Sequence, residues 1–451
     1  MAGSDKFPRP TSNGMNSYID EESKSLSEVH SSVPVPAGAS FLRKLLAFSG
    51  PGYLVAVGYM DPGNWATDLA GGAKFGYSLL FVILLSNIVA IILQHLALKL
   101  GVATGKDLAQ VCRDNYSKPV RIGLWLMAEV MIIATDLAEV IGSAIALNLL
   151  FNIPLAIGVV ITAADVLLIL MLQKKGFRYL EALIIALIGT IVVAFGLELL
   201  LSRPEIAPLL AGFIPSAAIF SDKEMLYIAL GIIGATVMPH NLFLHSSVVQ
   251  TRQYVRDLAG KKEAVKFATI DTVIALMGAF FVNAAILIMS ASVFHFSGYS
   301  DVADIDKAYE LLTPLLGTSL ASIVFALALL ASGQNSTLTG TLTGQIIMEG
   351  FLHLKMRPWL RRISTRLLAI IPALAVILFF SDFGVGRLLI LSQVVLSIQL
   401  PFAVVPLVMF TSDKERMGDF VNRRWLKTTA YLLAAGIIAL NVWLIYNLAF
   451  A

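Results

Sequence analysis

Two short segments combine metal-ligating side chains with a proline inside long apolar runs: Asp61–Asn64, which reads Asp-Pro-Gly-Asn, and Met238–Asn241, which reads Met-Pro-His-Asn. Proline cannot continue helical hydrogen bonding, so each segment predicts a break in an apolar helix. Backbone groups freed at membrane depth are tolerated only where they are buried in protein or line a cavity. Paired breaks at matching places in two halves of a chain are typical of secondary transporters with a midplane site. The alternative is that the two prolines merely kink two membrane helices.

The side chains at the two breaks predict a metal site with mixed oxygen and sulfur ligands. Asp61 offers an anionic oxygen, Asn64 a neutral carbonyl oxygen and Met238 a thioether sulfur. Oxygen ligands suit any divalent cation, whereas a thioether favours softer transition metals over Ca2+ and Mg2+. The set therefore points to Mn2+ and Fe2+, with Co2+, Ni2+, Zn2+ and Cd2+ as competitors. Backbone carbonyls freed by the breaks could complete the shell, and Gly58 and Ala235 are the expected donors.

The composition indicates a polytopic membrane protein. Of the 451 residues, 57% are hydrophobic and 14% are charged, and the mean hydropathy is +0.80, whereas soluble domains are about a quarter charged. The single cysteine, Cys112, excludes an intrachain disulfide and a cysteine-based zinc or iron–sulfur site. The polar residues 1–42 lack the apolar core of a signal peptide, so we expect a disordered cytoplasmic tail.

Eleven apolar stretches are long enough to cross a bilayer as helices, which takes about 20 residues. They lie near 46–71, 78–99, 120–149, 153–173, 179–201, 225–250, 265–293, 317–352, 365–381, 386–410 and 427–449. If the N-terminus is placed inside, most of the 33 Lys and Arg residues fall in inner loops and at inner span ends. The positive-inside rule therefore puts the N-terminus in the cytoplasm and the C-terminus outside.

This orientation predicts an inverted repeat. The first proline break lies in a span that runs outward, and the second lies in a span that runs inward. We therefore expect spans 1–5 in residues 43–201, an inverted second unit of spans 6–10 in residues 225–411, and an additional span 11 in residues 427–451.

Three separate motifs resemble those of a known family. Gly58–Trp65 (Gly-Tyr-Met-Asp-Pro-Gly-Asn-Trp) resembles the first-span signature of the Nramp divalent-metal transporters. Gly234–Asn241 (Gly-Ala-Thr-Val-Met-Pro-His-Asn), followed by Leu244–Ser246, resembles their sixth-span signature. The stretch Ala331–Gly350 is similar to their eighth-span motif, and the resemblance extends from about residue 45 to 449.

The resemblance implies an all-α, LeuT-like fold with broken helices 1 and 6, and proton-coupled import of Mn2+ or Fe2+ by alternating access. Carried over residue by residue, it makes Asp61, Asn64 and Met238 metal ligands, with the Ala235 carbonyl added in the inward-facing state. It places a further ligand of the occluded or outward-facing state at Gln393, in span 10. Some relatives that move magnesium or aluminium alter Asn64 or the sixth-span motif, which this chain keeps.

Proton coupling requires groups that exchange protons beside the site. Asp61 is one candidate, because burial raises the pKa of a carboxylate and a bound divalent cation lowers it, so metal and proton can compete there. His240 is the other, because the imidazole of histidine titrates near neutral pH. The resemblance adds a polar lane in span 3 with two candidate counter-charges: Glu129, Thr135, Asp136, Glu139, Arg252 and Arg366. The alternatives are that Glu129 is a structural partner for a neighbouring helix and that the two arginines only anchor inner span ends.

Two other functions compete with metal transport. A sodium-coupled transporter of an organic solute with the same fold would leave room at the first break, which Asp61, Asn64 and Met238 crowd. An intramembrane metalloenzyme, with metal on Asp61 and His240, would favour His-rich ligation and an open position for water. Neither reading explains the paired breaks together with a thioether. We therefore expect a monomeric, multi-pass plasma-membrane transporter of metal ions and protons, with no enzymatic activity, resident cofactor or nucleic-acid partner.

Overall fold

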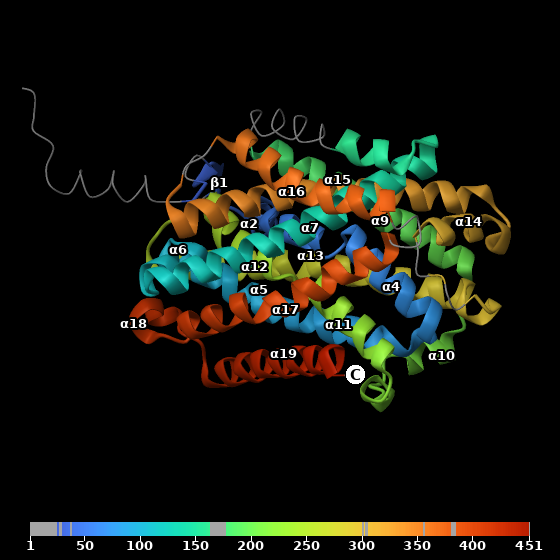
Figure 1. Ribbon diagram of the computed structural model, residues 1–451. Coiled ribbons are helices and arrows are strands. Elements are labelled where there is room, and N and C mark those ends of the chain that lie inside the picture. The colour runs from blue at the N-terminus through green and yellow to red at the C-terminus, as the bar shows by residue number, and fades with distance from the viewer. Residues whose placement is uncertain are drawn as a thin grey trace, which may run out of the picture.

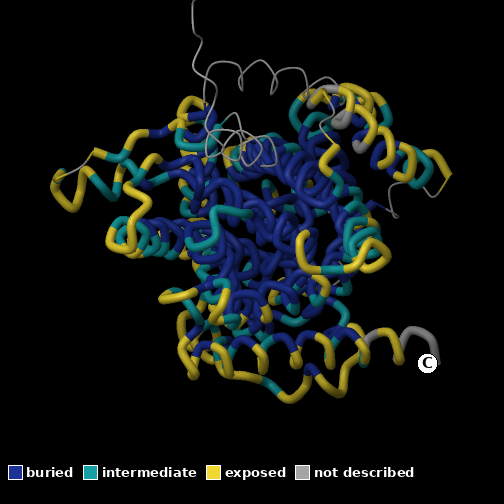
Figure 2. Tube along the Cα trace, turned by 90° about the vertical axis from the view of Figure 1, so that its left-hand side faces the viewer, coloured by how far each residue is buried: buried dark blue, intermediate teal, exposed yellow. Residues whose placement is uncertain are grey.

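The computed structural model is a bundle of helices, most of which lie side by side along one axis (Figure 1). It describes residues 25–26, 29–36, 38–162, 177–299, 302, 305–354, 357–379 and 385–450. Buried backbone fills the centre, and exposed segments lie around the rim (Figure 2).

The described elements include short 3-10 helices, labelled η, and one two-stranded parallel sheet. In chain order they are β1 (Val33–Pro34), α2 (Phe41–Phe48), α3 (Pro51–Gly58), α4 (Pro62–Phe75), η2 (Gly76–Leu79), α5 (Leu80–Thr104), α6 (Leu108–Asn115), α7 (Lys118–Phe151), α9 (Phe177–Ser202), α10 (Ile206–Ala211), η3 (Ala217–Phe220), α11 (Lys223–Val237), α12 (Pro239–Val248), η4 (Val249–Thr251), β2 (Arg252–Gln253), α13 (Leu258–Val293), η5 (His295–Ser297), α14 (Ile305–Leu316), α15 (Ser319–Leu352), α16 (Pro358–Phe379), α17 (Val385–Thr411), α18 (Lys414–Met417), η7 (Gly418–Phe420) and α19 (Arg424–Phe450).

The part of the chain that the structure describes holds eight helical stretches long and apolar enough to cross a membrane, with a shorter apolar helix at Arg366–Phe379. The number differs from the eleven predicted spans for local reasons. The first predicted span is divided among α2, α3 and α4, and α4 continues through η2 into α5 as one stretch, Pro62–Thr104. Most of the predicted span 153–173 lies outside the described residues. Eleven spans therefore stays a prediction.

The outer surface of the bundle is apolar, as a lipid-facing surface must be. Leu200 in α9 and Leu432 in α19 are 75% and 67% exposed. The interior, in contrast, contains buried Asp, Glu, His, Asn and Gln side chains among its apolar residues. This distribution describes a multi-pass membrane protein with a polar centre.

Both predicted helix breaks are present. Helix α3 ends at Gly58 and α4 begins at Pro62, while α11 ends at Val237 and α12 begins at Pro239. Helix α4 packs against α11, and α3 packs against α12. The first half of each broken helix therefore lies beside the second half of the other, so the two run antiparallel, as an inverted repeat requires.

Part of the segment predicted as a disordered tail has structure. Residues 1–24 lie outside the described part of the chain. Val33 and Pro34 form β1, which pairs in parallel with Arg252 and Gln253 of β2. Helix α2 then begins at Phe41, close to residue 43, where the first transmembrane unit is predicted to start.

Candidate metal-binding site

The first break leaves an anionic oxygen and a backbone carbonyl without hydrogen-bond partners in the interior. Asp61 is the N-cap of α4, and its Oδ1 accepts a hydrogen bond of 2.7 Å from the Asn64 N–H. Its second oxygen, Oδ2, has no hydrogen-bond partner. In a continuous helix the Gly58 carbonyl would accept from the N–H of residue 62, but Pro62 has none. The break therefore frees the Gly58 carbonyl that the sequence predicted as a donor.

The second break repeats this chemistry around a sulfur atom. Ala235 precedes Pro239 by four residues, so its carbonyl also lacks a helical N–H partner. Met238 links α11 to α12 with φ of 32° and ψ of 98°, a conformation that residues with a Cβ rarely adopt. The link gives the helices new directions and places the Met238 side chain in the fully buried interior.

Two glycines allow the breaks and a third helix to approach closely. A Cβ placed on Gly58 would lie 3.0 Å from Met238 Sδ and would overlap the Asn241 amide. A Cβ on Gly63 would overlap the side-chain amide of Gln393 in α17. The structure thus brings Gln393, which only the family resemblance suggested, against the first break.

Three buried oxygens at this centre lack hydrogen-bond partners: Asp61 Oδ2, Asn64 Oδ1 and Gln393 Oε1. These side chains are at most 1% exposed. Leaving a buried acceptor unsatisfied costs about 1–3 kcal/mol, and a divalent cation would offset that cost for all three. No group of three or more His, Cys, Asp and Glu side chains that could hold a metal occurs in the described ranges. The oxygen and thioether set is thus the metal-binding chemistry that this centre offers.

His240 connects the second break to the predicted polar lane. The ring lies two residues after Met238, and its Nδ1 is 3.4 Å from the Thr135 hydroxyl in α7. The Thr135 hydroxyl also donates to the Met131 carbonyl at 3.1 Å. His240 Nε2 has no partner. The imidazole is therefore held on one side by α7 and has its other nitrogen available in the interior.

Two carboxylates of α7, one directly after Thr135 and one a turn further along, meet an arginine. Arg366 Nη1 in α16 lies 3.3 Å from Glu139 Oε2 and 3.8 Å from Asp136 Oδ1. Arg366 Nη2 also donates to the Thr337 hydroxyl in α15 at 3.0 Å. Gly340 leaves room for both carboxylates, since its Cβ would lie 3.0 Å from Glu139. A compensating charge explains how this interior tolerates two acids.

Two other residues predicted for the lane lie elsewhere or at its edge. Arg252 is 2.7 Å from Glu181 Oε1 in α9 and donates to the Ser49 carbonyl at 2.6 Å, so its contacts lie at the start of α3. Glu129 is half-buried and accepts from Trp125 Nε1 at 2.9 Å. The structure thus joins Arg366, but not Arg252, to the α7 carboxylates.

Sequence reasoning missed one acidic side chain beside the site. Asp68 lies four residues after Asn64 on the same face of α4, is 1% exposed, and has no partner for Oδ2. The spacing of four residues from Asn64 was the signal that could have found it.

His245 of α12 has a structural role. Its Nδ1 lies 2.9 Å from Gln94 Oε1, and Gln94 Nε2 donates to the Tyr59 hydroxyl at 2.8 Å. This chain of contacts fixes α12 and α5 to the first break.

Comparison with known proteins identifies relatives over nearly the full length. A family model described as Natural resistance-associated macrophage protein-like (Nramp) matches residues 52–447. The chain is 60% identical over 425 residues to the divalent metal cation transporter MntH of Nostoc sp., covering 94% of this chain and 96% of that protein. It is 59% identical over 426 residues to the protein of the same name from Listeria welshimeri, covering 94% and 95%.

Solved structures agree with this likeness. A mutant of the Eremococcus coleocola manganese transporter matches with a TM-score of 0.88 at 44% identity, covering 94% of this chain and 91% of that chain. Mhp1, a nucleobase-cation-symport-1 family transporter in a closed conformation, matches with a TM-score of 0.55 at 14% identity, covering 92% and 94%. The second likeness concerns the fold alone, and the predicted LeuT-like fold is confirmed.

Proposed function

The chain belongs to the Nramp family and is a divalent metal cation transporter of the membrane, and from this premise we propose that it imports Mn2+ and Fe2+ together with protons by alternating access. Mn2+ and Fe2+ are the transported substrates. The named relatives are transporters rather than enzymes. We place the N-terminus in the cytoplasm and the C-terminus outside, because most Lys and Arg residues then lie on the inner side.

The observation that supports this function most strongly is the set of unpaired buried oxygens beside a thioether. We propose Asp61, Asn64, Met238 and Gln393 as side-chain ligands, with the Gly58 and Ala235 carbonyls completing the shell as conformation changes. The Asp61 carboxylate supplies charge, the amide oxygens supply neutral ligation, and the Met238 sulfur favours transition metals over Ca2+ and Mg2+.

Alternating access follows from how the two breaks pack. The four side-chain ligands are at most 1% exposed, so substrate can reach them only after helices separate. Helix α3 packs against α12, which leads to β2, and α4 packs against α11, while α17 contacts α4, α11 and α12. We therefore assign α3 and α12 to the closure on the side of β1 and β2, and α4 and α11 to the closure on the other side. The Asn241 amide strengthens the first closure by donating to the Val55 carbonyl at 3.2 Å. Parting one group while the other stays closed would expose the site to one side at a time.

The proton route that we propose leaves the metal site through α7. Metal binding requires Asp61 to be ionised, so a proton carried by Asp61 must leave when metal binds. His240 is held against Thr135, and Asp136 and Glu139 follow on the same helix. Arg366 stabilises the ionised carboxylates, so protonation there changes the net charge of a buried cluster. Glu129 would extend this route along α7, and Arg252 would act outside it.

The testing experiment is Mn2+ uptake into proteoliposomes, with and without an inward proton gradient, while lumenal pH is recorded. We expect gradient-stimulated uptake and lumenal acidification that depends on Mn2+. Asp61→Asn is the matched variant, because an Asn side chain can still accept from the Asn64 N–H while lacking the charge. We expect it to lose at least about 90% of uptake. Full uptake by Asp61→Asn would overturn the ligand assignment, and gradient-independent uptake would overturn proton coupling.

A further inference from the structure

A short N-terminal segment contacts the end of α15, and also η4 and β2, which follow α12 in the chain. We call residues 25–26 and 29–36 the N-terminal strap. The Leu26 N–H donates to Glu349 Oε2 at the end of α15 at 3.0 Å, and Leu26 is 2% exposed. The Ser31 N–H donates to the Gln250 carbonyl at 3.0 Å, and the Val35 N–H to the Gln253 carbonyl at 3.2 Å. The strap therefore contacts two helices before the chain enters α2.

The strand that the strap pairs with also holds the start of the first broken helix. Arg252 in β2 is the register partner of Val33 in β1. Its guanidinium donates to the Ser49 carbonyl between α2 and α3 and to the buried Glu181 carboxylate. Backbone pairing with the strap and side-chain contact with Ser49 thus act on the same residue.

The backbone turns between α2 and α3 at a glycine. Gly50 has φ of 143°, which residues with a side chain avoid, and a Cβ there would overlap Glu181 and Arg252. Asp271 of α13 accepts from the Gly52 N–H at 2.7 Å. Arg178 donates to the Leu46 carbonyl at 2.8 Å. The junction is therefore a hinge sequence held by charged side chains from three neighbouring segments: β2, α9 and α13.

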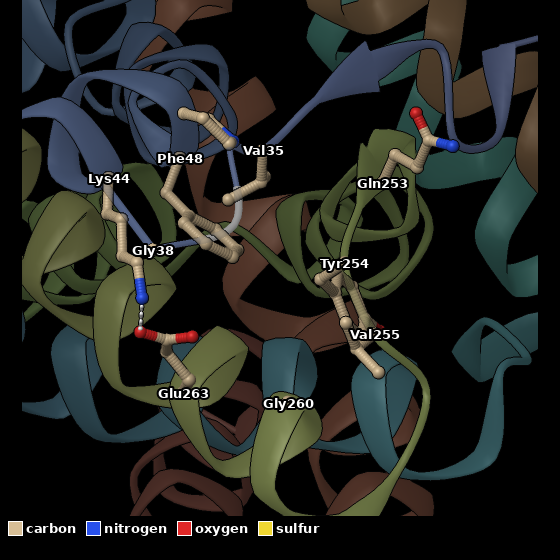
Figure 3. A pocket seen from close by; sticks show the side chains of 10 residues that line it. Val35, Gly38, Lys44, Phe48, Gln253, Tyr254, Val255, Gly260 and Glu263 are labelled. Atoms are coloured by element: carbon tan, nitrogen blue, oxygen red, sulfur yellow. Dashed lines mark hydrogen bonds and ion pairs between the residues drawn. The ribbon is translucent and has the colours of Figure 1, made fainter.

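A pocket of about 480 Å³ lies between the strap, α2 and the start of α13 (Figure 3). Val35 and Gly38 line one side, and Lys44 of α2 pairs with Glu263 of α13 across it. Beside the pocket, the Phe48 ring stacks on Phe267 at 5.6 Å between centroids. The Phe41 ring lies 5.2 Å from the same Phe267 ring, so α2 is joined to α13 by one ion pair and by aromatic packing around Phe267.

We propose that the N-terminal strap is a latch on the cytoplasmic gate, which must unpair from β2 before the metal site opens to the cytoplasm. This inference rests on the proposed alternating access and orientation. Opening that side requires α3 to part from α12. The strap is covalently continuous with α2 and α3, whereas its partner β2 follows α12 through the short helix η4. Parting the two helices therefore pulls β1 away from β2 and withdraws Arg252 from Ser49.

The latch is built to release. The strap is paired by a few backbone hydrogen bonds at an edge, and a two-residue strand pair has little stability of its own. Two further features keep the strap in place. Its register partner Arg252 also binds the Ser49 carbonyl, and the Leu26 side chain is buried. A change that ties the strap to β2 should stop the transport cycle, and a change that loosens it should favour the open gate.

The first test locks the latch with a disulfide. Pro34 and Gln253 are exposed register partners, so Pro34→Cys with Gln253→Cys, in a Cys112→Ser background, places two thiols on adjacent strands. We expect the oxidised double variant to lose at least 90% of Mn2+ uptake and to recover it on reduction. Each single cysteine variant, oxidised in the same way, is the matched control and should retain uptake. Wild-type uptake by the cross-linked protein would overturn the latch.

The second test loosens the latch without touching the metal site. Val35→Pro removes the N–H that donates to Gln253, while Pro36→Ala changes a neighbouring residue that donates no hydrogen bond. We expect amide hydrogen exchange in residues 51–58 to become at least threefold faster in Val35→Pro and to stay unchanged in Pro36→Ala. Equal exchange in both would overturn the latch. If wild-type protein takes up no Mn2+ but the exchange difference is present, the proposed function fails while the coupling of the strap to α3 stands.

Discussion

Met238 combines an unusual backbone conformation with an unusual ligand. A non-glycine residue at φ of 32° carries strain of about 1–3 kcal/mol. Packing sustains it: Gly58 lets Met238 Sδ approach, and Asn241 Nδ2 lies 3.7 Å from the same sulfur. This backbone conformation places the thioether beside Gly58, where the first helix break begins.

Met238→Ala tests the selectivity that the sulfur confers. The variant keeps the oxygen ligands and loses the soft ligand, so we expect the apparent affinity for Mn2+ and Cd2+ to fall about tenfold, or about 1.4 kcal/mol. Ca2+ should at the same time become a better competitor. Competition uptake assays with Mn2+, Cd2+ and Ca2+ measure both effects. Full discrimination against Ca2+ in the variant would contradict a selective role for the thioether.

Some site residues could be predicted from the sequence and others could not. Asp61, Asn64 and Met238 lie within three residues of a proline, and the proline's effect on the helix is local. Gln393 has no such local signal, because its place against Gly63 depends on how α17 packs, and only the family resemblance pointed to it. Arg252 and Arg366 look alike in sequence, yet tertiary packing gives them different carboxylate partners.

At the scale of elements, the breaks depend on two missing backbone donors. Pro62 and Pro239 each stand four residues after a carbonyl that we assign to the metal shell, and each occupies the first turn of the second half-helix. Proline is favoured there because its fixed φ suits the start of a helix and its missing N–H costs nothing. The same residue therefore ends one helix, starts the next and leaves a carbonyl free.

Pro239→Ala restores one of these donors. The new N–H can donate to the Ala235 carbonyl, which favours a continuous α11–α12 helix and removes that oxygen from the metal shell. We expect a higher melting temperature in detergent and an Mn2+ affinity lower by a factor of about 3–10. Calorimetry of Mn2+ binding measures the affinity. Leu242→Ala, an apolar change within α12, controls for general loosening of this helix and should lower the melting temperature instead.

Arg366 joins α16 to α7. We expect its replacement to lower the stability of the protein and to weaken the coupling of Mn2+ uptake to the proton gradient. Arg366→Gln leaves Asp136 and Glu139 buried without their cation, which typically costs about 3–5 kcal/mol when one partner of a buried pair is removed. We expect a lower melting temperature and weaker dependence of Mn2+ uptake on the proton gradient. Adding Glu139→Gln should recover stability without recovering gradient dependence. Recovery of gradient dependence in the double variant would remove Glu139 from the proton route.

At the scale of the whole molecule, hydropathy predicted the bundle well and its ends poorly. Long apolar stretches must become helices in a bilayer, because every backbone group has to be satisfied internally. No such constraint acts on the polar N-terminal region, where the strap is held by tertiary contacts to α15 and β2. Those contacts join residues more than 200 positions apart, so composition alone favoured disorder.

The polar ends of the bundle should also make stability depend on pH. Asp107 lies between α5 and α6, and its Oδ1 accepts from the Gln110 N–H at the start of α6. Burial raises the pKa of Asp107 from 3.8 to about 6. The hydrogen bond from Gln110 and the positive charge of Arg113 lower the pKa, but by less than burial raises it. The folded protein thus holds this proton more tightly than the unfolded chain. The resulting stability is fully present below about pH 4 and is lost as pH rises through 6.

Asp107→Asn keeps the helix cap but cannot ionise. We expect its melting temperature in detergent to exceed that of the wild type by a few degrees at pH 7.5 and to match it near pH 4, because only the wild type must then bury a charge at the higher pH. The free-energy difference is at most about 3 kcal/mol, from roughly two units of pKa. Asp114→Asn is the matched control on the same helix: the pKa of Asp114 is lowered, with ion-pair contacts to Lys106 and Arg113. That variant should therefore be less stable than the wild type at pH 7.5. A higher melting temperature for both variants at pH 7.5 would show that lost surface charge, rather than burial at Asp107, sets the dependence on pH.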